Sequence, residues 1–194
     1  MDVGCQVIVA LVTIYLLQST NACRCMSGHP QQEICTRNFA MKAKILANNV
    51  VIDNIPYTRR LTVKVKDNFK GVSGNIETLY TYDHGSLCGA NLTVKKTYLI
   101  TGVIRDNRRV ISTCYLIQEW KDVDPCVQIK LKRGIYLRNC NCKVRQCRPE
   151  HCGTAAPNEC TLNIFEHRPE LSNGLCRKRR GVCTWEECPG LRYG

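Results

Sequence analysis

Residues 23–35 read CRCMSGHPQQEIC and contain three of the chain's 15 cysteines. Cys5 is the one cysteine that precedes this stretch, so an even number remains from Cys23 onward. An even and dense set of cysteines is typical of a disulfide framework formed in an oxidising compartment. The alternative is metal binding at Cys140-x-Cys142 and Cys147-x4-Cys152, which oxidised sulfurs do not support because the thiolate is the metal ligand.

The segment before Cys23 has the pattern of a secretory signal peptide. Its apolar run, Val7 to Leu17, has the length of a signal-peptide core and is too short for a membrane-spanning helix. Thr20 and Ala22 place small residues at the −3 and −1 positions of a cut before Cys23. We expect residues 1–22 to be removed and the protein to be secreted to the extracellular space or matrix, without a membrane span. An uncleaved anchor is the alternative, because this leader has no Lys or Arg.

The chain is strongly basic, with a formal net charge of +12, and it has a basic cluster at Arg177–Arg180. Positive charge on an extracellular protein favours sulfated glycosaminoglycans or acidic cell-surface partners. The alternative is a cationic surface that serves only solubility. Nucleic acid is not expected as a partner, because a secreted protein is separated from the nucleic acid of the cell. The sequence also has no basic stripe interleaved with aromatic residues.

The density of cysteines divides the chain into two parts. Residues 23–141 carry seven cysteines, and the much shorter 142–194 carries seven more. The first part has the longer apolar patterns and can form its own core, whereas a small domain of this size depends on disulfides. We place the boundary near Asn141 and expect a small disulfide-rich domain after it.

The first part reads mainly as β-structure. Residues 61–66 alternate apolar and polar side chains, as a half-buried strand does. Further strands are expected at 40–47, 97–102 and 110–117, with a turn at 106–107. About five strands in a segment of this length favour a small closed barrel over an open sheet.

Two helices are expected to flank these strands. The first spans 30–37 and begins with Pro30 at the first helical position. The second spans 125–133, between Asp124 as the N-cap and Gly134 as a stop signal. The apolar residues of 125–133 also alternate as in a strand, and the capping residues favour the helix.

No recognised catalytic motif is present, and the protein is not expected to be an enzyme. The sequence lacks G-x-S-x-G, H-E-x-x-H and a phosphate-binding glycine loop. Its four histidines, His29, His84, His151 and His167, show no helical metal-ligand spacing. Oxidised cysteines cannot act as nucleophiles.

The motif at 23–35, a C-x-C followed by H-P-Q-Q and a further Cys, resembles the start of the tissue inhibitors of metalloproteinases. Matches in the same order follow at Ala40–Lys44, Ser86–Gly89, Ser112–Cys114 with Trp120, and Cys183–Trp185. The resemblance extends over the whole chain after the leader. It implies a five-stranded, OB-like barrel, the netrin-like module, with flanking helices and a small C-terminal domain.

The resemblance also implies a disulfide pattern. The implied pairs are Cys23–Cys88, Cys25–Cys114, Cys35–Cys140, Cys142–Cys183, Cys147–Cys152 and Cys160–Cys176. Cys126 and Cys188 have no counterpart in the common family pattern, and we predict that they pair with each other. The alternative is a pair of free or intermolecular thiols.

By the same resemblance, the α-amine and carbonyl oxygen of Cys23 chelate the catalytic zinc of a target protease. The protein itself would need no cofactor. Its expected partners are secreted zinc metalloproteinases of the matrix type, bound 1:1 by a monomer. The contact residues implied are Cys23, Arg24, Cys25, Met26 and Ser27 on one side of the protease cleft, and Gly85, Ser86, Leu87 and Cys88 on the other.

Two residues of the contact segment depart from the family. Arg24 stands where Thr or Ser is usual, at the side chain that enters the protease S1′ pocket, and Ser27 replaces a common Pro. Asn91 begins the N-glycosylation sequence Asn-Leu-Thr, and we expect it to carry a glycan. The alternative function is a netrin-like module that binds matrix or glycosaminoglycans without inhibiting proteases.

Overall fold

A computed structural model of the chain describes residues 23, 25, 28–51, 58–83, 88–163, 165 and 173–188. The predicted signal peptide lies outside these residues. Within them, no helix has both the length and the apolar character that a membrane crossing requires.

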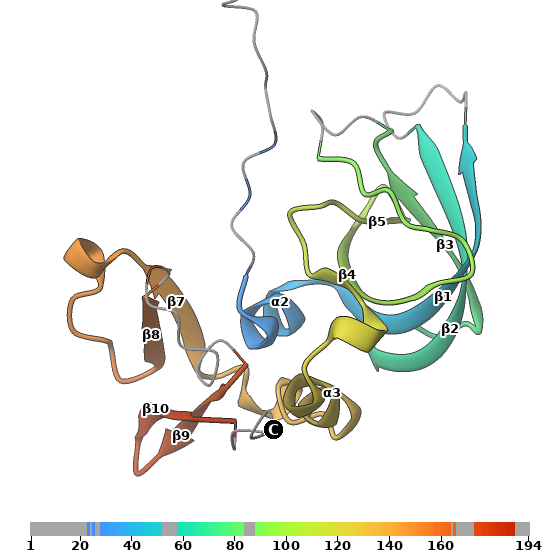
Figure 1. Ribbon diagram of the computed structural model, residues 1–194. Coiled ribbons are helices and arrows are strands. Elements are labelled where there is room, and N and C mark those ends of the chain that lie inside the picture. Colours follow the sequence, from blue (N-terminus) through green and yellow to red (C-terminus); the bar gives the residue numbers. More distant parts are fainter. Residues whose placement is uncertain are drawn as a thin grey trace, which may run out of the picture.

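The first part of the chain forms a closed β-barrel (Figure 1). Its strands are β1 (Phe39–Val50), β2 (Arg59–Lys70), β3 (Ile76–Thr81), β4 (Thr97–Arg105), β5 (Arg108–Val110) and β6 (Ile117–Glu119). They follow the order β1-β2-β3-β5-β4-β6, and β1 also pairs with β4, which closes a five-stranded barrel and leaves β6 as an added edge strand. The predicted mainly-β fold is confirmed.

The interior of the barrel follows from alternation along its long strands. Phe39, Met41, Ala43 and Ile45 of β1 are all fully buried in one cluster, as two-residue periodicity requires. Three register shifts interrupt the pairing of β1 with β2. Bulges of this kind bend a strand and increase its twist, which allows a small sheet to close on itself.

The strand predicted at 110–117 is wrong. β5 ends at Val110, and β6 begins at Ile117. Between them the Ser112 hydroxyl accepts a hydrogen bond from the Cys114 N–H (3.2 Å), and the Tyr115 N–H bonds to the Ser112 carbonyl (3.0 Å). The local turn satisfies backbone groups that a strand would have used.

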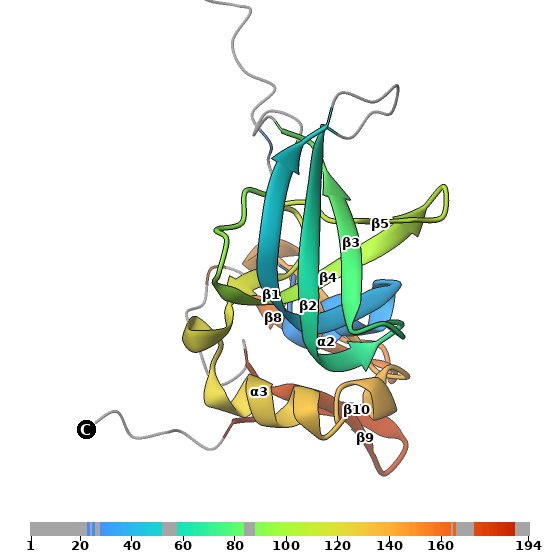
Figure 2. The same cartoon turned by 90° about the vertical axis from the view of Figure 1, so that its right-hand side faces the viewer.

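The other strand predictions match β1, β2 and β4, with longer bounds than expected. Asp106 and Asn107 form the β4–β5 turn, and both have positive φ, 47° and 57°. Consecutive residues of this conformation match the twist of a tight hairpin, which projects from the barrel in Figure 2. β3 was not predicted.

Both predicted helices are present as α2 (Pro30–Thr36) and α3 (Pro125–Lys132). Asp124 caps α3 by accepting a hydrogen bond from the Cys126 N–H at 2.7 Å, and Gly134 follows the helix with φ 62°. Short 3-10 helices lie at Trp120–Asp122, Leu137–Asn139 and Pro149–His151. A second apolar cluster joins α2 and α3 to the outside of the barrel through Ala40 and Leu99.

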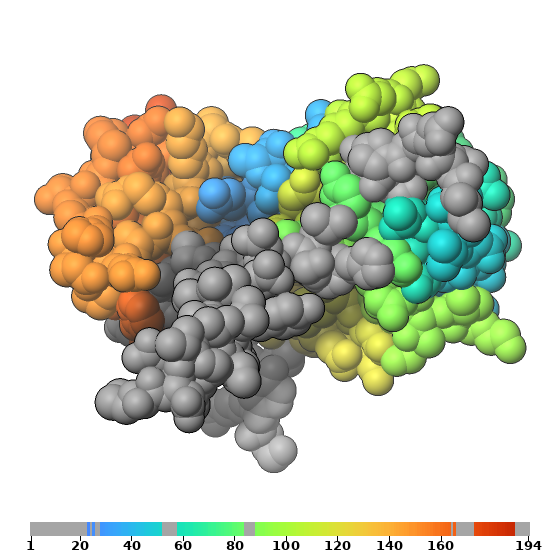
Figure 3. Space-filling view, turned by 90° about the horizontal axis from the view of Figure 1, so that it is seen from above, coloured from blue at the N-terminus to red at the C-terminus, as the bar shows by residue number. Residues whose placement is uncertain are grey.

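The C-terminal part contains two small sheets. β7 (Lys143–Cys147) pairs in parallel with β8 (Glu159–Asn163), and β9 (Leu175–Arg179) forms a hairpin with β10 (Val182–Glu186). Figure 1 shows α2 between the barrel and these strands, and Figure 3 shows the same arrangement from above. The boundary near Asn141 stays a prediction.

Candidate functional site

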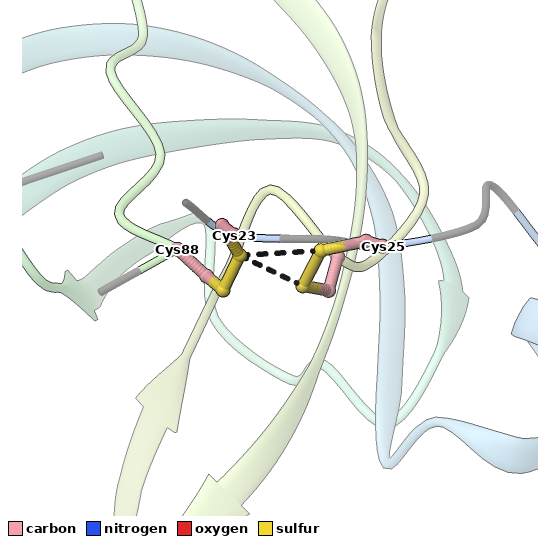
Figure 4. Close-up of side chains that lie close together, drawn as sticks. Cys23, Cys25 and Cys88 are labelled. Carbon is pink, nitrogen blue, oxygen red and sulfur yellow. Dashed lines mark hydrogen bonds between the residues drawn. A yellow bond between two sulfur atoms is a disulfide. The ribbon is translucent and has the colours of Figure 1, made fainter. Parts of the chain in front are cut away.

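Two disulfides attach the start of the described chain to the barrel. Cys23 is bonded to Cys88 and Cys25 to Cys114, with Cα–Cα distances of 5.3 and 5.0 Å. Figure 4 shows both bonds side by side beneath the segment that carries Cys23 and Cys25. We call the segment from Cys23 to Gly28 the arm.

The two disulfides are in contact with each other. The Cys23 sulfur lies 3.3 Å from that of Cys25 and 3.4 Å from that of Cys114, and all four sulfurs are within 4.8 Å of one another. Four free thiols at such distances would suit a tetrahedral zinc ion. Here every sulfur is bonded to another, so no thiolate is available, and the Cys23 side chain is not a metal ligand.

The Cys88 side of the site is fixed by the end of β3. The buried Thr81 hydroxyl accepts a hydrogen bond from the Ala90 N–H at 2.9 Å, which ties the segment after Cys88 to the sheet. The Cys88 carbonyl in turn accepts a bond from the Thr113 N–H at 3.0 Å. The two segments that receive the arm's disulfides are therefore joined directly to each other.

The Cys114 side is fixed by β4. The N–H of Leu116 donates to the Thr101 hydroxyl at 3.0 Å, and the Thr101 N–H donates to the Leu116 carbonyl at 2.9 Å. Thr101 is fully buried. A rigid barrel strand therefore holds the loop that carries Cys114.

The arm leads directly into α2, whose start is well capped. The Nδ1 atom of the buried His29 accepts a hydrogen bond from the Gln31 N–H at 3.1 Å, and Pro30 follows at the first helical position. The His29 ring also contacts Trp185, with 5.2 Å between ring centroids. The sequence indicated Pro30 as a helix start, but His29 as the cap was missed.

Gln31 connects α2 to the C-terminal part. Its side chain is fully buried, and its Nε2 donates to the carbonyls of Asn139 (2.9 Å), Cys142 (3.3 Å) and Cys176 (2.8 Å). Its Oε1 accepts from the Cys176 N–H at 2.8 Å. One amide thus satisfies backbone groups from two segments, the turn at Asn139–Cys142 and the strand that contains Cys176.

The other end of α2 is held by β2. The ammonium group of Lys70 donates to the carbonyls of Ile34 and Cys35, both at 3.0 Å. A cation is favourable at this end of a helix, where carbonyl groups lack helical partners. Burial lowers the pKa of Lys70.

A second lysine lies inside the junction between α3 and the C-terminal segment. Lys130 is 6% exposed, and its Nζ lies 2.7 and 2.8 Å from the sulfurs of the Cys126–Cys188 disulfide. It donates to the Asn173 carbonyl at 3.1 Å, as does the Tyr136 hydroxyl at 3.1 Å. Burial lowers the pKa of Lys130 and raises that of Tyr136.

The structure contains seven disulfides, which use all fourteen cysteines from Cys23 onward. They are the six pairs implied by the resemblance together with Cys126–Cys188. The cysteines at 140, 142, 147 and 152 are all among them, so these residues offer no thiolates to a metal.

The contact residues expected from the sequence are only partly described. Cys23, Cys25 and Cys88 are brought together, whereas Arg24, Met26, Ser27, Gly85, Ser86 and Leu87 lie outside the described residues. Asn91 is exposed, and its Oδ1 accepts from the Asn48 side chain at 3.3 Å. Its glycosylation stays a prediction.

A family model described as "Tissue inhibitor of metalloproteinase" matches residues 21–187. The chain belongs to this family. It is 32% identical over 192 residues to metalloproteinase inhibitor 2 of Homo sapiens, covering 90% of this chain and 86% of that protein. It is 29% identical over 192 residues to metalloproteinase inhibitor 3 of Scyliorhinus torazame, covering 92% and 87%. It is 31% identical over 180 residues to metalloproteinase inhibitor 4 of Rattus norvegicus, covering 84% and 80%.

The match to the tissue inhibitors of metalloproteinases includes both structural parts. It begins before Cys23 and ends next to Cys188, so it contains the arm, the barrel and the β7–β10 region. The family assignment made from the motif at 23–35 is therefore confirmed over nearly the whole described chain.

Proposed function

We propose that this protein is a secreted inhibitor of zinc metalloproteinases of the matrix type. The observation that carries the proposal is the pair of adjoining disulfides that fixes Cys23 and Cys25 on the barrel. Family membership supports the same function, since the relatives are named metalloproteinase inhibitors. We further propose that the inhibitor acts as a monomer in a 1:1 complex.

The proposed contact with zinc is made by the backbone of Cys23. A catalytic zinc has three protein ligands and an open position for water or substrate. Removal of residues 1–22 would give Cys23 a free α-amine, which together with the carbonyl oxygen of the same residue forms a five-membered chelate. An α-amine titrates at roughly 7.7–8.0, so displacing its proton at neutral pH costs little.

The architecture of the site suits such a chelate. A flexible N-terminus would lose conformational freedom on binding, and this cost would weaken the complex. The disulfides at Cys23 and Cys25 remove much of that freedom before binding, and the bond between Thr113 and Cys88 joins the two anchoring segments. No peptide bond of the inhibitor would then lie across the metal, so the protease could not cleave it.

The decisive experiment extends the N-terminus by one residue. Protein beginning at Cys23 is compared with protein carrying an added Ala before Cys23, using the catalytic domain of a matrix metalloproteinase. The extension converts the amine into an amide and leaves the disulfides intact. We expect the inhibition constant to rise at least about a hundredfold, the size of losing a strong directional contact.

The matched control carries the added Ala after Gly194, at the other end of the chain. It should inhibit as the unextended protein does. Equal inhibition by the N-terminally extended protein would overturn the chelation proposal.

A second proposed function is binding to sulfated glycosaminoglycans. Lys44 and Lys64 are direct cross-strand neighbours on β1 and β2, and Arg60 and Lys66 lie on the same outer side of β2. None of these four has an ion-pair partner among the described residues. Like charges placed directly opposite each other favour an external anion.

Heparin affinity chromatography tests this second function. A Lys64→Glu/Lys66→Glu variant should elute at lower salt than the parent protein, while a Lys121→Glu/Lys132→Glu variant, changed in two other exposed lysines, should shift less. If both variants elute at equally lowered salt concentrations, heparin binding depends only on net charge, and the proposed site is wrong.

A further inference from the structure

We infer that Glu33 and Arg37 form a bracket that positions the inhibitory arm, and that they thereby set the strength of inhibition. Both residues belong to the first helix after the arm, Glu33 within α2 and Arg37 at its C-cap. The inference rests on the proposed function, in which the arm chelates zinc. It assigns to these two residues a positioning role that the disulfides do not supply by themselves.

The first part of the bracket is an ion pair between a buried carboxylate and a partly exposed guanidinium. Glu33 is 4% exposed, and its two carboxylate oxygens accept from Arg37, Oε2 from Nε at 2.8 Å and Oε1 from Nη2 at 2.9 Å. Paired bonds of this kind fix the planes of both groups relative to each other. The Glu33 carboxylate therefore has a defined position and a partner for its charge.

The second part reaches the loop that carries Cys114. The Glu33 carboxylate accepts a third hydrogen bond through Oε2, at 3.3 Å from the Leu116 N–H, which it shares with the Thr101 hydroxyl at 3.0 Å. The Arg37 guanidinium lies 4.1 Å from the centre of the Tyr115 ring. Tyr115 and Leu116 directly follow Cys114. Contacts from α2 therefore hold the segment next to the Cys25–Cys114 disulfide.

The third part is a close approach to the arm at Gly28. A Cβ atom placed on Gly28 would lie 2.5 Å from Oε1 of Glu33 and 2.9 Å from its Cγ. Such distances are too short for any side chain, so the backbone at Gly28 packs directly on the Glu33 carboxylate. Gly28 does not have a positive φ, so glycine is not needed here for its backbone freedom. It is needed because a side chain at this position would clash with Glu33.

Together with the arm itself, these contacts form a closed ring. From Cys25 the disulfide leads to Cys114, the chain continues to Leu116, Leu116 bonds to Glu33, and Glu33 contacts Gly28 at the end of the arm. The two disulfides fix Cys23 and Cys25, and the bracket adds a third fixed point at Gly28, three residues after Cys25. With its base held at Gly28 as well, the arm has less freedom left to lose when it binds.

The main test replaces Glu33 and measures inhibition of a matrix metalloproteinase catalytic domain. Glu33→Ala removes all three contacts, and we expect the inhibition constant to rise about tenfold, the effect of leaving roughly one more residue to be ordered on binding. Glu33→Gln keeps an oxygen for the Leu116 N–H and the size of the side chain. Its inhibition constant should rise less, about threefold.

The matched control is another Arg–Glu pair, which joins two strands of the C-terminal part. Arg145 of β7 bonds to Glu159 of β8 through Nε and Oε2 at 3.1 Å. Glu159→Ala should lower the unfolding temperature without changing the inhibition constant by more than about twofold. A general loss of stability would instead affect inhibition in both variants alike.

A double variant tests the contact at Gly28. Gly28→Ala should weaken inhibition about as much as Glu33→Ala, because the added methyl group displaces the carboxylate. With Glu33→Ala already present, adding Gly28→Ala should cost little more, since the clashing group is gone. If the rise in the inhibition constant of the double variant equals the product of the rises in the two single variants, the bracket is wrong.

Hydrogen exchange separates failure of this inference from failure of the proposed function. In the free inhibitor, Glu33→Ala should speed exchange at the Leu116 amide, which then keeps only its bond to the Thr101 hydroxyl, and in the arm, whereas Glu159→Ala should not. If the N-terminal extension abolishes inhibition but Glu33→Ala changes neither inhibition nor exchange, the bracket is wrong. If the extension has no effect, chelation is wrong, and the exchange measurement still decides whether the bracket orders the arm.

Discussion

Gln31 and Cys176 exchange two hydrogen bonds across the junction between α2 and the C-terminal strands. The Gln31 Nε2 donates to the Cys176 carbonyl and its Oε1 accepts from the Cys176 N–H, both at 2.8 Å. Cys176 is itself bonded to Cys160, so the amide contacts a point that a disulfide already fixes. The helix that follows the arm is therefore tied to the C-terminal part by a side chain that no water reaches.

Replacing Gln31 by Glu should be strongly destabilising. The substitution keeps the shape but turns the Nε2 donor into an oxygen that faces the carbonyls of Asn139, Cys142 and Cys176. An unpaired charge buried among acceptors should lower the free energy of unfolding by roughly 4 kcal/mol. Urea denaturation with the disulfides intact measures this change.

The control for this prediction is Gln118, an exposed residue that donates one bond to the Asp122 carbonyl at 2.8 Å. Gln118→Glu should change the free energy of unfolding by about 0.5 kcal/mol or less. Similar losses in the two variants would show that the buried network around Gln31 contributes little.

Much of the barrel could be predicted because its signals are local. The alternation within residues 61–66 and the caps at Asp124 and Gly134 each depend on a few neighbouring residues, and both survive in the structure. β3 was missed because its residue types do not alternate: Leu79 and Tyr80 are adjacent apolar residues, and the other buried position of the strand, Thr81, is polar. The strand expected at 110–117 failed because Ser112 competes for the backbone.

The sequence predicted the candidate site only for those residues that belong to the family motif. The Cys23–Cys88 and Cys25–Cys114 pairs were implied by the resemblance, whereas the contacts of Gln31 and Glu33 could not be read from the sequence. Their partners, such as Leu116 and Cys176, lie far along the chain and bond through backbone atoms. Every residue type has these atoms, so the sequence does not reveal such contacts. Only the spacing of Glu33 and Arg37, four residues apart, was a visible signal for an ion pair.

Stability should rise with pH in the alkaline range because of Lys130. Burial lowers the pKa of Lys130 in the folded protein, and the nearby carboxylates Glu186 and Asp124 only partly oppose this effect. Between that lowered pKa and the unfolded value of about 10.4, the unfolded chain binds more protons, so the free energy of unfolding increases with pH. The slope from this one group is at most about 1.4 kcal/mol per pH unit.

Comparison with Lys130→Met isolates this contribution. Urea denaturation from pH 7 to 10 should give a flatter pH dependence for the variant, while Lys70, whose pKa is also lowered, contributes equally to both proteins. Tyr136 acts in the opposite direction and only above roughly pH 10, since its raised pKa keeps it protonated in the folded state. Parallel curves for the two proteins would contradict the assignment to Lys130.

The Cys126–Cys188 disulfide should contribute more to stability than Cys147–Cys152. The first closes a loop with a sequence separation of 62, and the second one of 5. In the chain-entropy description these loops correspond to about 4 and about 2 kcal/mol. Double Ser variants of each pair, unfolded in urea without reductant, should differ in that order. A larger loss for the short loop would show that native contacts rather than chain entropy dominate.

Arg24 should narrow the range of proteases that the inhibitor binds. The family resemblance implies that its side chain would enter the S1′ pocket of the target. A shallow apolar pocket would then bury an unpaired charge at a cost of several kcal/mol. A deep or acid-ended pocket would instead let the guanidinium reach water or a carboxylate. Arg24→Thr should therefore lower the inhibition constant roughly 10- to 100-fold on shallow-pocket enzymes and less than about threefold on deep-pocket ones. Equal changes on both enzyme classes would argue that Arg24 affects the inhibitor itself and does not select its targets.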